Sequence, residues 1–255
     1  MPRYAILGVE GQHDQAFITK LLRNLGFQNF SGIDADLDPF WRPLVPTYPK
    51  GGKHYVRMDM PAIISTSDIS VAIYSAEGSN LREKFPATFV NHPIFTTGIA
   101  AFGIIADSDN SPCAGVATAY ASVYQGFFPQ FPNAPGIVDL SPVRTGIFVF
   151  PDNVNQGTLE NVILECANIV YPDLQSKAQV YLSGIDRTML KCADVSEINK
   201  PAGEKKALAS CISSVLKPGK TIQTSIQDNR WLEPRTLLLP SVINVTNFLK
   251  QLLSI

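Results

Sequence analysis

Short apolar runs alternate with stretches of helical periodicity along most of the chain. Four runs have the length and composition of strands, at residues 4–9, 69–74, 100–106 and 146–150. The run at 100–106 is apolar throughout, as expected for a strand buried on both faces of a parallel sheet. Apolar residues recur every three or four positions in four other stretches, which predicts amphipathic helices over 14–25, 159–170, 204–216 and 242–253.

This alternation of strands and helices predicts an α/β fold. We expect a compact sandwich, with a central and mainly parallel sheet flanked by helices, in one domain over residues 1–255. Residues 34–67 are rich in proline and show no periodicity, so we expect a surface insertion there. The last two periodic stretches predict a helical C-terminal extension over residues 200–255.

Composition and charge exclude several classes of protein. With 45% hydrophobic residues and a net charge of -1 over 255 residues, the chain is neither disordered nor a strongly basic nucleic-acid binder. The cysteines form no CxxC pair and the histidines no HExxH motif, so we expect no zinc site. The N-terminus lacks the apolar core of a signal peptide, and no apolar run has the length of a membrane helix. We therefore expect a cytoplasmic protein with no membrane partner.

Acidic residues follow three of the predicted strands. Since the carboxyl ends of parallel strands meet at one edge of a sheet, where ligands bind in open α/β sheets, we expect these residues to gather there. Carboxylates brought together repel one another, and a bound divalent cation such as Mg²⁺ relieves the repulsion. Taken alone, each pair is also typical of an ordinary turn or helix start. The pairs are Glu10 with Asp14, Asp107 with Asp109, and Asp152 with Glu160.

Two of these pairs lie in segments with a family resemblance. Residues 9–18, Val-Glu-Gly-Gln-His-Asp-Gln-Ala-Phe-Ile, resemble the first motif of the Toprim (topoisomerase–primase) family, and residues 104–109, Ile-Ile-Ala-Asp-Ser-Asp, resemble its DxD motif. The resemblance implies that Glu10 is an acid/base or metal ligand and that Asp107 and Asp109 bind Mg²⁺, or Mn²⁺ in its place. Asp14 matches the downstream aspartate of the family's nuclease branch.

The third pair extends the resemblance. Residues 151–160 look like a segment of small standalone Toprim-like proteins, a group similar to the Toprim half of OLD-type (overcoming lysogenization defect) nucleases. This implies that Glu160 is a metal ligand and that Asp152 and Asn153 support it. Either Lys200 or Lys205 matches a lysine that follows in those nucleases, and Lys205 is the expected catalytic lysine. The interval between Glu10 and Asp107 is longer than a minimal Toprim domain needs, in keeping with an insertion.

The resemblance therefore predicts a Mg²⁺-dependent phosphodiester hydrolase, a nuclease acting on DNA or RNA. Contact with nucleic acid needs local positive charge, which the overall charge does not provide. The basic residues of the proline-rich segment offer it, although such a run is also typical of a solvated loop. They are Arg42, Lys50, Lys53 and Arg57.

Two other functions stay open. The site could serve a Mg²⁺-dependent phosphotransferase or phosphohydrolase acting on a small phosphorylated substrate, although the chain has no GxxxxGK[ST] loop. Alternatively, a Toprim-like scaffold without turnover could act as a binding or regulatory protein. A second copy of the chain or a regulatory protein stays open as a partner.

Overall fold

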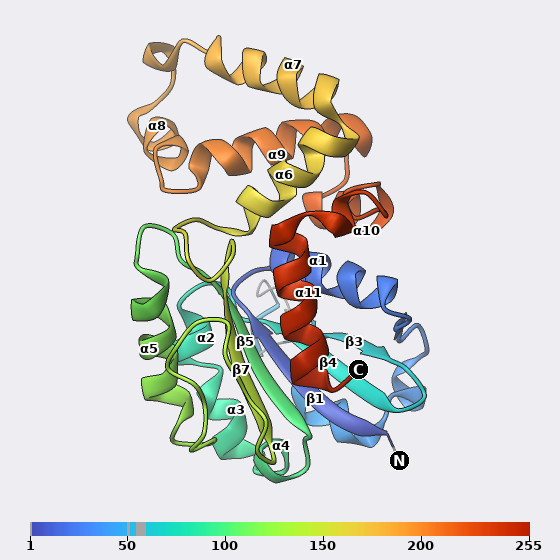
Figure 1. The fold of residues 1–255 in the computed structure, drawn as a ribbon. Coiled ribbons are helices and arrows are strands. Elements are labelled where there is room, and N and C mark those ends of the chain that lie inside the picture. The colour runs from blue at the N-terminus through green and yellow to red at the C-terminus, as the bar shows by residue number, and fades with distance from the viewer. Residues whose placement is uncertain (1, 50–51, 55–59) are drawn as a thin grey trace.

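The computed structural model describes residues 2–49, 52–54 and 60–255 (Figure 1). In this part of the chain the strands form one seven-stranded sheet in the order β2-β3-β4-β1-β5-β7-β6. The central strands β4, β1, β5 and β7 are parallel, while β2, β3 and β6 run antiparallel to their neighbours. The strands span Arg3–Val9 (β1), Gln28–Asn29 (β2), Ala62–Ser65 (β3), Ile69–Ser75 (β4), Ala101–Asp107 (β5), Val138–Asp139 (β6) and Arg144–Phe150 (β7).

The register of the parallel strands brings their carboxyl ends to one edge. Val9 at the end of β1 pairs with Ser75 in β4 and Ile105 in β5. Asp107 at the end of β5 pairs with Phe150 in β7. Residues that directly follow β1, β5 and β7 are therefore neighbours in space although they are far apart in the sequence.

Helices cover both faces of the sheet. On one face, apolar side chains of α1, α6, α10 and α11 form a core with β1, β4, β5 and β7. On the other face, α2 to α5 form a second, more aromatic core. The helices of the two layers span Gln12–Asn24 (α1), Asn80–Glu83 (α2), Pro86–Asn91 (α3), Ile94–Thr97 (α4), Cys113–Tyr124 (α5), Leu159–Val170 (α6), Ile222–Asp228 (α10) and Pro240–Leu253 (α11).

A helical lobe lies beyond the carboxyl edge of the sheet. In Figure 1, α7, α8 and α9 stack with α6 above the upper end of the strands. These three helices span Pro172–Ser183 (α7), Cys192–Ile198 (α8) and Gly203–Leu216 (α9). Short 3₁₀ helices occur at Asp34–Asp36 (η1), Pro39–Leu44 (η2), Arg187–Met189 (η4) and Thr236–Leu238 (η5). This helical lobe therefore covers the carboxyl edge of the sheet, where ligands bind in open α/β folds.

The predicted α/β fold is confirmed, with its mainly parallel sheet and its C-terminal helices. Residues 34–67 include the sheet strand β3, and Trp41 is fully buried with its Nε1 donating to Ser70 Oγ at 2.8 Å. Within 200–255, α11 packs on β5, β6 and β7 as part of the sandwich. The resemblance to Toprim domains stays a prediction.

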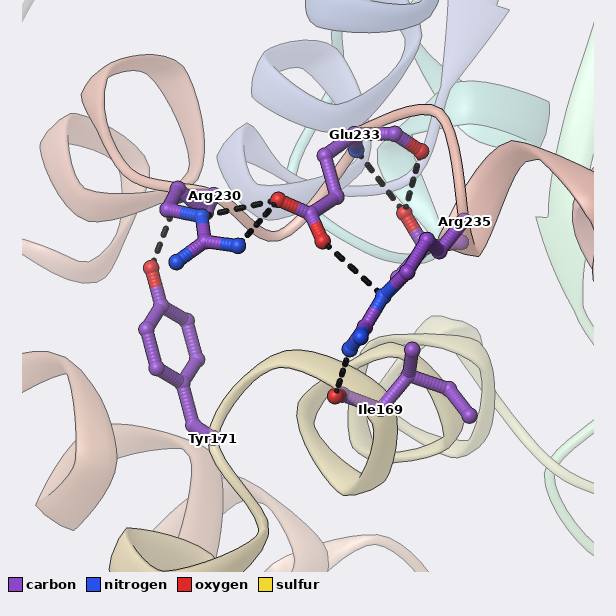
Figure 2. Close-up of polar contacts among 6 residues, drawn as sticks. Ile169, Tyr171, Arg230, Glu233 and Arg235 are labelled. Carbon is purple, nitrogen blue, oxygen red and sulfur yellow. Dashed lines mark hydrogen bonds and ion pairs between the residues drawn. The ribbon is translucent and has the colours of Figure 1, made fainter.

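Polar contacts fix the turn between α10 and α11 (Figure 2). The Glu233 carboxylate accepts from Arg230 at 2.7 Å and pairs with Arg235 at 3.4 Å. Arg235 pairs with Glu233 through Nε, and its Nη2 donates to the carbonyl of Ile169 in the last turn of α6. A cation at this position complements the helix dipole. These contacts join the C-terminal layer to α6.

None of the helices in the described residues is long and apolar enough to cross a membrane.

Candidate functional site

Four of the predicted carboxylates gather at the carboxyl edge of the sheet. Glu10 directly follows β1, Asp107 ends β5, and Glu160 lies in the first turn of α6 after β7. Because β1, β5 and β7 are consecutive in the sheet, these residues meet, and α1 adds Asp14 from its own first turn. The charges of Asp14, Glu10 and Glu160 all act on the Asp107 carboxyl.

Burial and mutual repulsion raise the pKa of three of these carboxyls, those of Glu10, Asp14 and Asp107. The Asp14 side chain is buried, and burial together with the charges of Glu10 and Glu160 raises its pKa from 3.8 to about 8. Burial likewise raises the pKa of Glu10 from 4.5 to about 7, with a smaller contribution from the charge of Asp109. The pKa of Asp107 lies well above its ordinary value because of burial and the neighbouring charge of Asp14. An added cation would relieve this repulsion.

One oxygen of each of two aspartates is held by a backbone N–H. Asp14 Oδ2 accepts from the N–H of Gly11 at 2.8 Å, which also closes the first turn of α1. Asp107 Oδ1 accepts from the N–H of Leu159 at 2.9 Å, one of the unpaired donors at the start of α6. Asp14 is therefore both a helix-start residue and a member of the cluster.

Side chains hold the two glutamates in the same way. Tyr120 on α5 donates its hydroxyl proton to Glu10 Oε1 at 2.8 Å. His13 Nδ1 lies 3.4 Å from Glu160 Oε1. Burial alone raises the pKa of Glu160, but the His13 contact and the charge of Lys206 outweigh it, so this pKa lies below its ordinary value. Glu160 is thus the carboxylate that stays ionised.

One carboxylate oxygen of the cluster lacks a hydrogen-bond donor among the described residues. The Glu160 side chain is 3% exposed, and its Oε2 has no hydrogen-bond partner in the part of the chain that the structure describes. A buried carboxylate oxygen without a donor is the kind of atom that a cation satisfies. Among the described residues, however, no three His, Cys, Asp or Glu side chains are arranged to hold one metal ion. Mg²⁺ is commonly bound by one or two carboxylates with waters and substrate phosphates, and the five-residue ligand set stays a prediction.

The DxD loop is shaped by its middle residue. Ser108 is buried, and its hydroxyl accepts from the N–H of Gly157 at 2.7 Å, which ties the end of β5 to the loop before α6. The N–H groups of Ser108 and Asp109 both donate to the Gly157 carbonyl. Asp109 has a left-handed backbone (φ 49) and an exposed side chain, so it stands at the mouth of the cluster while Asp107 lies inside.

Two further predicted residues shape a turn. Asp152 accepts from the N–H groups of Val154 and Asn155 and from the Asn155 side chain, and although its partial burial opposes them, these hydrogen bonds lower its pKa. Asn153 accepts from the N–H of Val149 at 2.8 Å. Both residues therefore fix the loop between β7 and α6, and their supporting role in the site stays a prediction.

The lysines near the cluster differ in their contacts. Lys205 Nζ donates to Asn161 Oδ1 at 2.9 Å, in the first turn of α6. The charge that acts on Asp14 and Glu160 is that of its neighbour Lys206. Lys200 pairs with Glu197 at 2.6 Å. The sequence patterns indicated neither Lys206 nor Arg82. The charge of Arg82 acts on Glu10, and the guanidinium carbon of Arg82 lies 5.5 Å from the centre of the Tyr120 ring.

The predicted basic surface is described only in part. Arg42 is exposed on η2 and donates to the carbonyl of Asp34 at 3.4 Å. Lys53 is exposed, and Lys50 and Arg57 lie outside the described residues. The role of these four residues stays a prediction.

Nearly the whole chain matches one protein family. A family model described as "Protein of unknown function (DUF3226)" matches residues 4–254. The chain belongs to the DUF3226 family. No curated protein matches this DUF3226 chain. Its fold is similar to the crystal structure of a hypothetical protein from Pyrococcus horikoshii OT3, with a TM-score of 0.51 and 16% identity over 96% of this chain and 98% of that chain. At that identity the likeness shows a shared fold alone.

Proposed function

We propose that this DUF3226 protein is a Mg²⁺-dependent phosphodiester hydrolase that cleaves nucleic acid. The observation that carries the proposal is the gathering of Glu10, Asp14, Asp107 and Glu160 at the carboxyl edge of the sheet. A bound Mg²⁺ would neutralise charge on the phosphate and make a bound water more acidic. Asp107 and Glu160 are the residues best suited to hold it, with Asp14 beside them.

The other residues divide the remaining tasks. Glu10 has a pKa of about 7, which suits a group that accepts a proton from water at neutral pH. Tyr120 holds Glu10 Oε1 in position. Asp109, exposed at the mouth of the cluster, is placed to meet a ligand or its hydrated ion first. Lys205 stays the predicted catalytic lysine, and its bond to Asn161 supports a role in fixing the start of α6.

A hydrolase of small phosphorylated substrates would use the same residues, as would a scaffold that binds Mg²⁺ without turnover. The repulsion within the cluster speaks against an unused site, because four neighbouring carboxyls lower the stability of the fold unless a bound ligand offsets their repulsion.

A cytoplasmic location is part of the proposal. It is supported by the four cysteines, all of which are free thiols, as is usual in a reducing compartment.

The experiment is a cleavage assay with labelled single- and double-stranded DNA and RNA, in Mg²⁺ and in Mn²⁺. Glu10→Gln and Asp107→Asn proteins are compared with the parent chain, and Asp173→Asn serves as an exposed control substitution. The proposal predicts cleavage that both site substitutions abolish and that the control keeps. Intact polymers in every sample, with Mg²⁺ binding retained, would turn the search to phosphorylated small molecules.

A further inference from the structure

Two hollows meet at the acidic cluster. One has a volume of about 500 Å³, lies between α2 and the start of α5, and includes Glu10 and Asp107 in its wall. The other has a volume of about 560 Å³, lies along the segment from the end of α8 to the start of α9, and includes Lys206. Asp109 belongs to the wall of both hollows. The two hollows therefore adjoin at Asp109, and together they are called the groove below.

Each half of the groove carries a cation that is available to a ligand. Arg82 lies in the first hollow and Lys206 in the second, one on either side of the carboxylates. Both side chains are exposed, and none of the ion pairs among the described residues involves them. Lys200, also in the second hollow, is already paired with Glu197. The order of charges along the groove is thus positive, negative, positive.

We propose that this groove binds one strand of nucleic acid, DNA or RNA, with successive backbone phosphates at Arg82, at the carboxylates and at Lys206. The inference rests on the proposed function, in which a cation at the carboxylates receives the central phosphate. Apolar side chains such as Val116 in one hollow and Ile198 in the other line the path for sugars and bases. A single strand thereby meets positive charge on both sides of the reacting phosphate.

The dimensions of the site favour one strand over a duplex. Each hollow is comparable to pockets of about 300–1,000 Å³ that enclose a drug-sized molecule, which is about the size of a nucleotide. Glu10 and Asp107 lie in the wall of the first hollow, so the backbone must enter that hollow to reach them. A single strand bends to do so, whereas duplex DNA is stiff over about 150 base pairs. A small phosphorylated molecule would fill one hollow and need one of the two cations.

Binding measurements test the groove without relying on cleavage. Fluorescence anisotropy with Ca²⁺ in place of Mg²⁺ compares a labelled single strand of DNA, the same sequence as RNA, and the DNA duplex, over a range of KCl concentrations. The proteins are the parent chain, Arg82→Gln/Lys206→Gln, and the charge-matched control Lys84→Gln/Lys177→Gln. Lys84 is an exposed lysine next to α2, and Lys177 is exposed on α7.

The parent and control proteins should bind single strands about tenfold or more tightly than the duplex. The Arg82/Lys206 variant should lose that affinity, and its slope of log K against log salt should fall by about 0.7 for each lost phosphate contact. The tighter of the DNA and RNA strands identifies the polymer. Equal affinity for the duplex, or an unchanged slope in the variant, would overturn the inference.

Hydrolysis of bis(4-nitrophenyl) phosphate separates this inference from the proposed function. This small diester needs only the carboxylate centre, so its hydrolysis should depend on Glu10. The Arg82/Lys206 variant should lose at least about tenfold more activity on the oligonucleotide than on the small diester, because only the oligonucleotide has flanking phosphates to contact both cations. A protein that binds strands as described but hydrolyses neither substrate contradicts the hydrolase and leaves the groove established. Equal losses on both substrates would contradict the groove.

Discussion

Tyr120 and Glu10 are 110 positions apart in the sequence, and the Tyr120 hydroxyl donates a hydrogen bond of 2.8 Å to Glu10 Oε1. The tyrosine is buried on α5, and the glutamate follows the central strand β1. Burial raises the pKa of Glu10 to about 7, while this hydrogen bond acts in the opposite direction because it stabilises the ionised form. The helix layer therefore tunes the acidity of a residue at the end of the sheet.

Replacing Tyr120 with phenylalanine should raise the pKa of Glu10. The substitution keeps the ring below Arg82 but removes the donor to Glu10, so the carboxyl holds its proton to a higher pH. If the protein hydrolyses bis(4-nitrophenyl) phosphate, the acidic limb of its pH–rate profile should move to higher pH by about one unit. A carboxyl ¹³C NMR titration of Glu10 measures the same shift without any need for turnover.

Tyr124→Phe is the matched control for this experiment. Tyr124 is the next tyrosine on the buried face of α5, and its hydroxyl donates to the carbonyl of Leu81 without reaching Glu10. Loss of either hydroxyl should cost about 1 kcal/mol of stability, but only Tyr120→Phe should move the Glu10 titration. Equal titration curves for the two variants would show that Tyr120 does not set this pKa.

The cluster should make the metal-free protein less stable as the pH rises. Glu10 and Asp14 have pKa values of about 7 and about 8 in the folded chain, above their ordinary values of 4.5 and 3.8. Below about pH 3 both the folded and the unfolded states hold these protons. As the pH then rises to about 8, the unfolded chain releases them first, so unfolding becomes easier. Thermal unfolding in EDTA should show a midpoint lower by roughly 5 °C or more at about pH 8 than at about pH 5.

Mg²⁺ should restore most of this loss at about pH 8 and have little effect at about pH 5, because it competes with protons for the same carboxylates. Asp14→Asn removes one of the repelling charges, so the metal-free variant should lose less stability over the same pH range. Asp173→Asn, on the exposed surface of α7, should behave like the parent chain. A midpoint that stays level or rises with pH in EDTA would contradict the repulsion.

The sequence predicts the strands that build the site because their apolar runs are long and continuous. The runs at 100–106 and 146–150 correspond to β5 and β7, and the carboxylates that follow them do gather. Periodicity also located α1, α6, α9 and α11 to within about two residues. What these segments share is burial, which leaves a strong pattern of apolar positions.

The missing parts of the site have weaker local signals. Tyr120 lies on the apolar stripe of α5 like any core residue, and its contact with Glu10 depends on how α5 docks on the sheet. Arg82 belongs to α2, a helix of four residues that is too short for a periodic pattern. Lys206 and Lys205 are adjacent, so only the rotation of α9 decides which of their charges acts on the carboxylates. Each of these facts depends on tertiary packing.

The contacts in Figure 2 should contribute measurably to stability. Glu233 joins two arginines and its side chain is only 15% exposed, so its ion pairs are less screened than those on the open surface. Glu233→Gln should therefore lower the free energy of unfolding by about 1 kcal/mol in urea denaturation. Asp173→Asn removes an exposed pair with Lys177 and should cost about 0–0.5 kcal/mol. Equal costs for the two variants would assign no special role to the Glu233 bridge.

Gly103 should be required for the docking of α11 on the sheet. A Cβ atom at this position of β5 would lie 2.4 Å from Leu252 Cδ2 and 3.1 Å from Leu7 Cδ2, closer than packed carbon atoms approach. Gly103→Ala should therefore destabilise the protein by about 1–3 kcal/mol, although alanine usually stabilises a strand relative to glycine. Urea denaturation measures this difference.

The Gly103 prediction has a rescue and a control. Leu252→Ala alone should destabilise by about 2–5 kcal/mol, and Gly103→Ala should cost less in that background because the colliding methyl group is gone. Gly115 in α5 has no atom within 4 Å of the same added group, so Gly115→Ala should be neutral or stabilising by up to about 1 kcal/mol. If Gly103→Ala costs the same with and without Leu252, the two residues are not in contact and α11 is held on the sheet in another way.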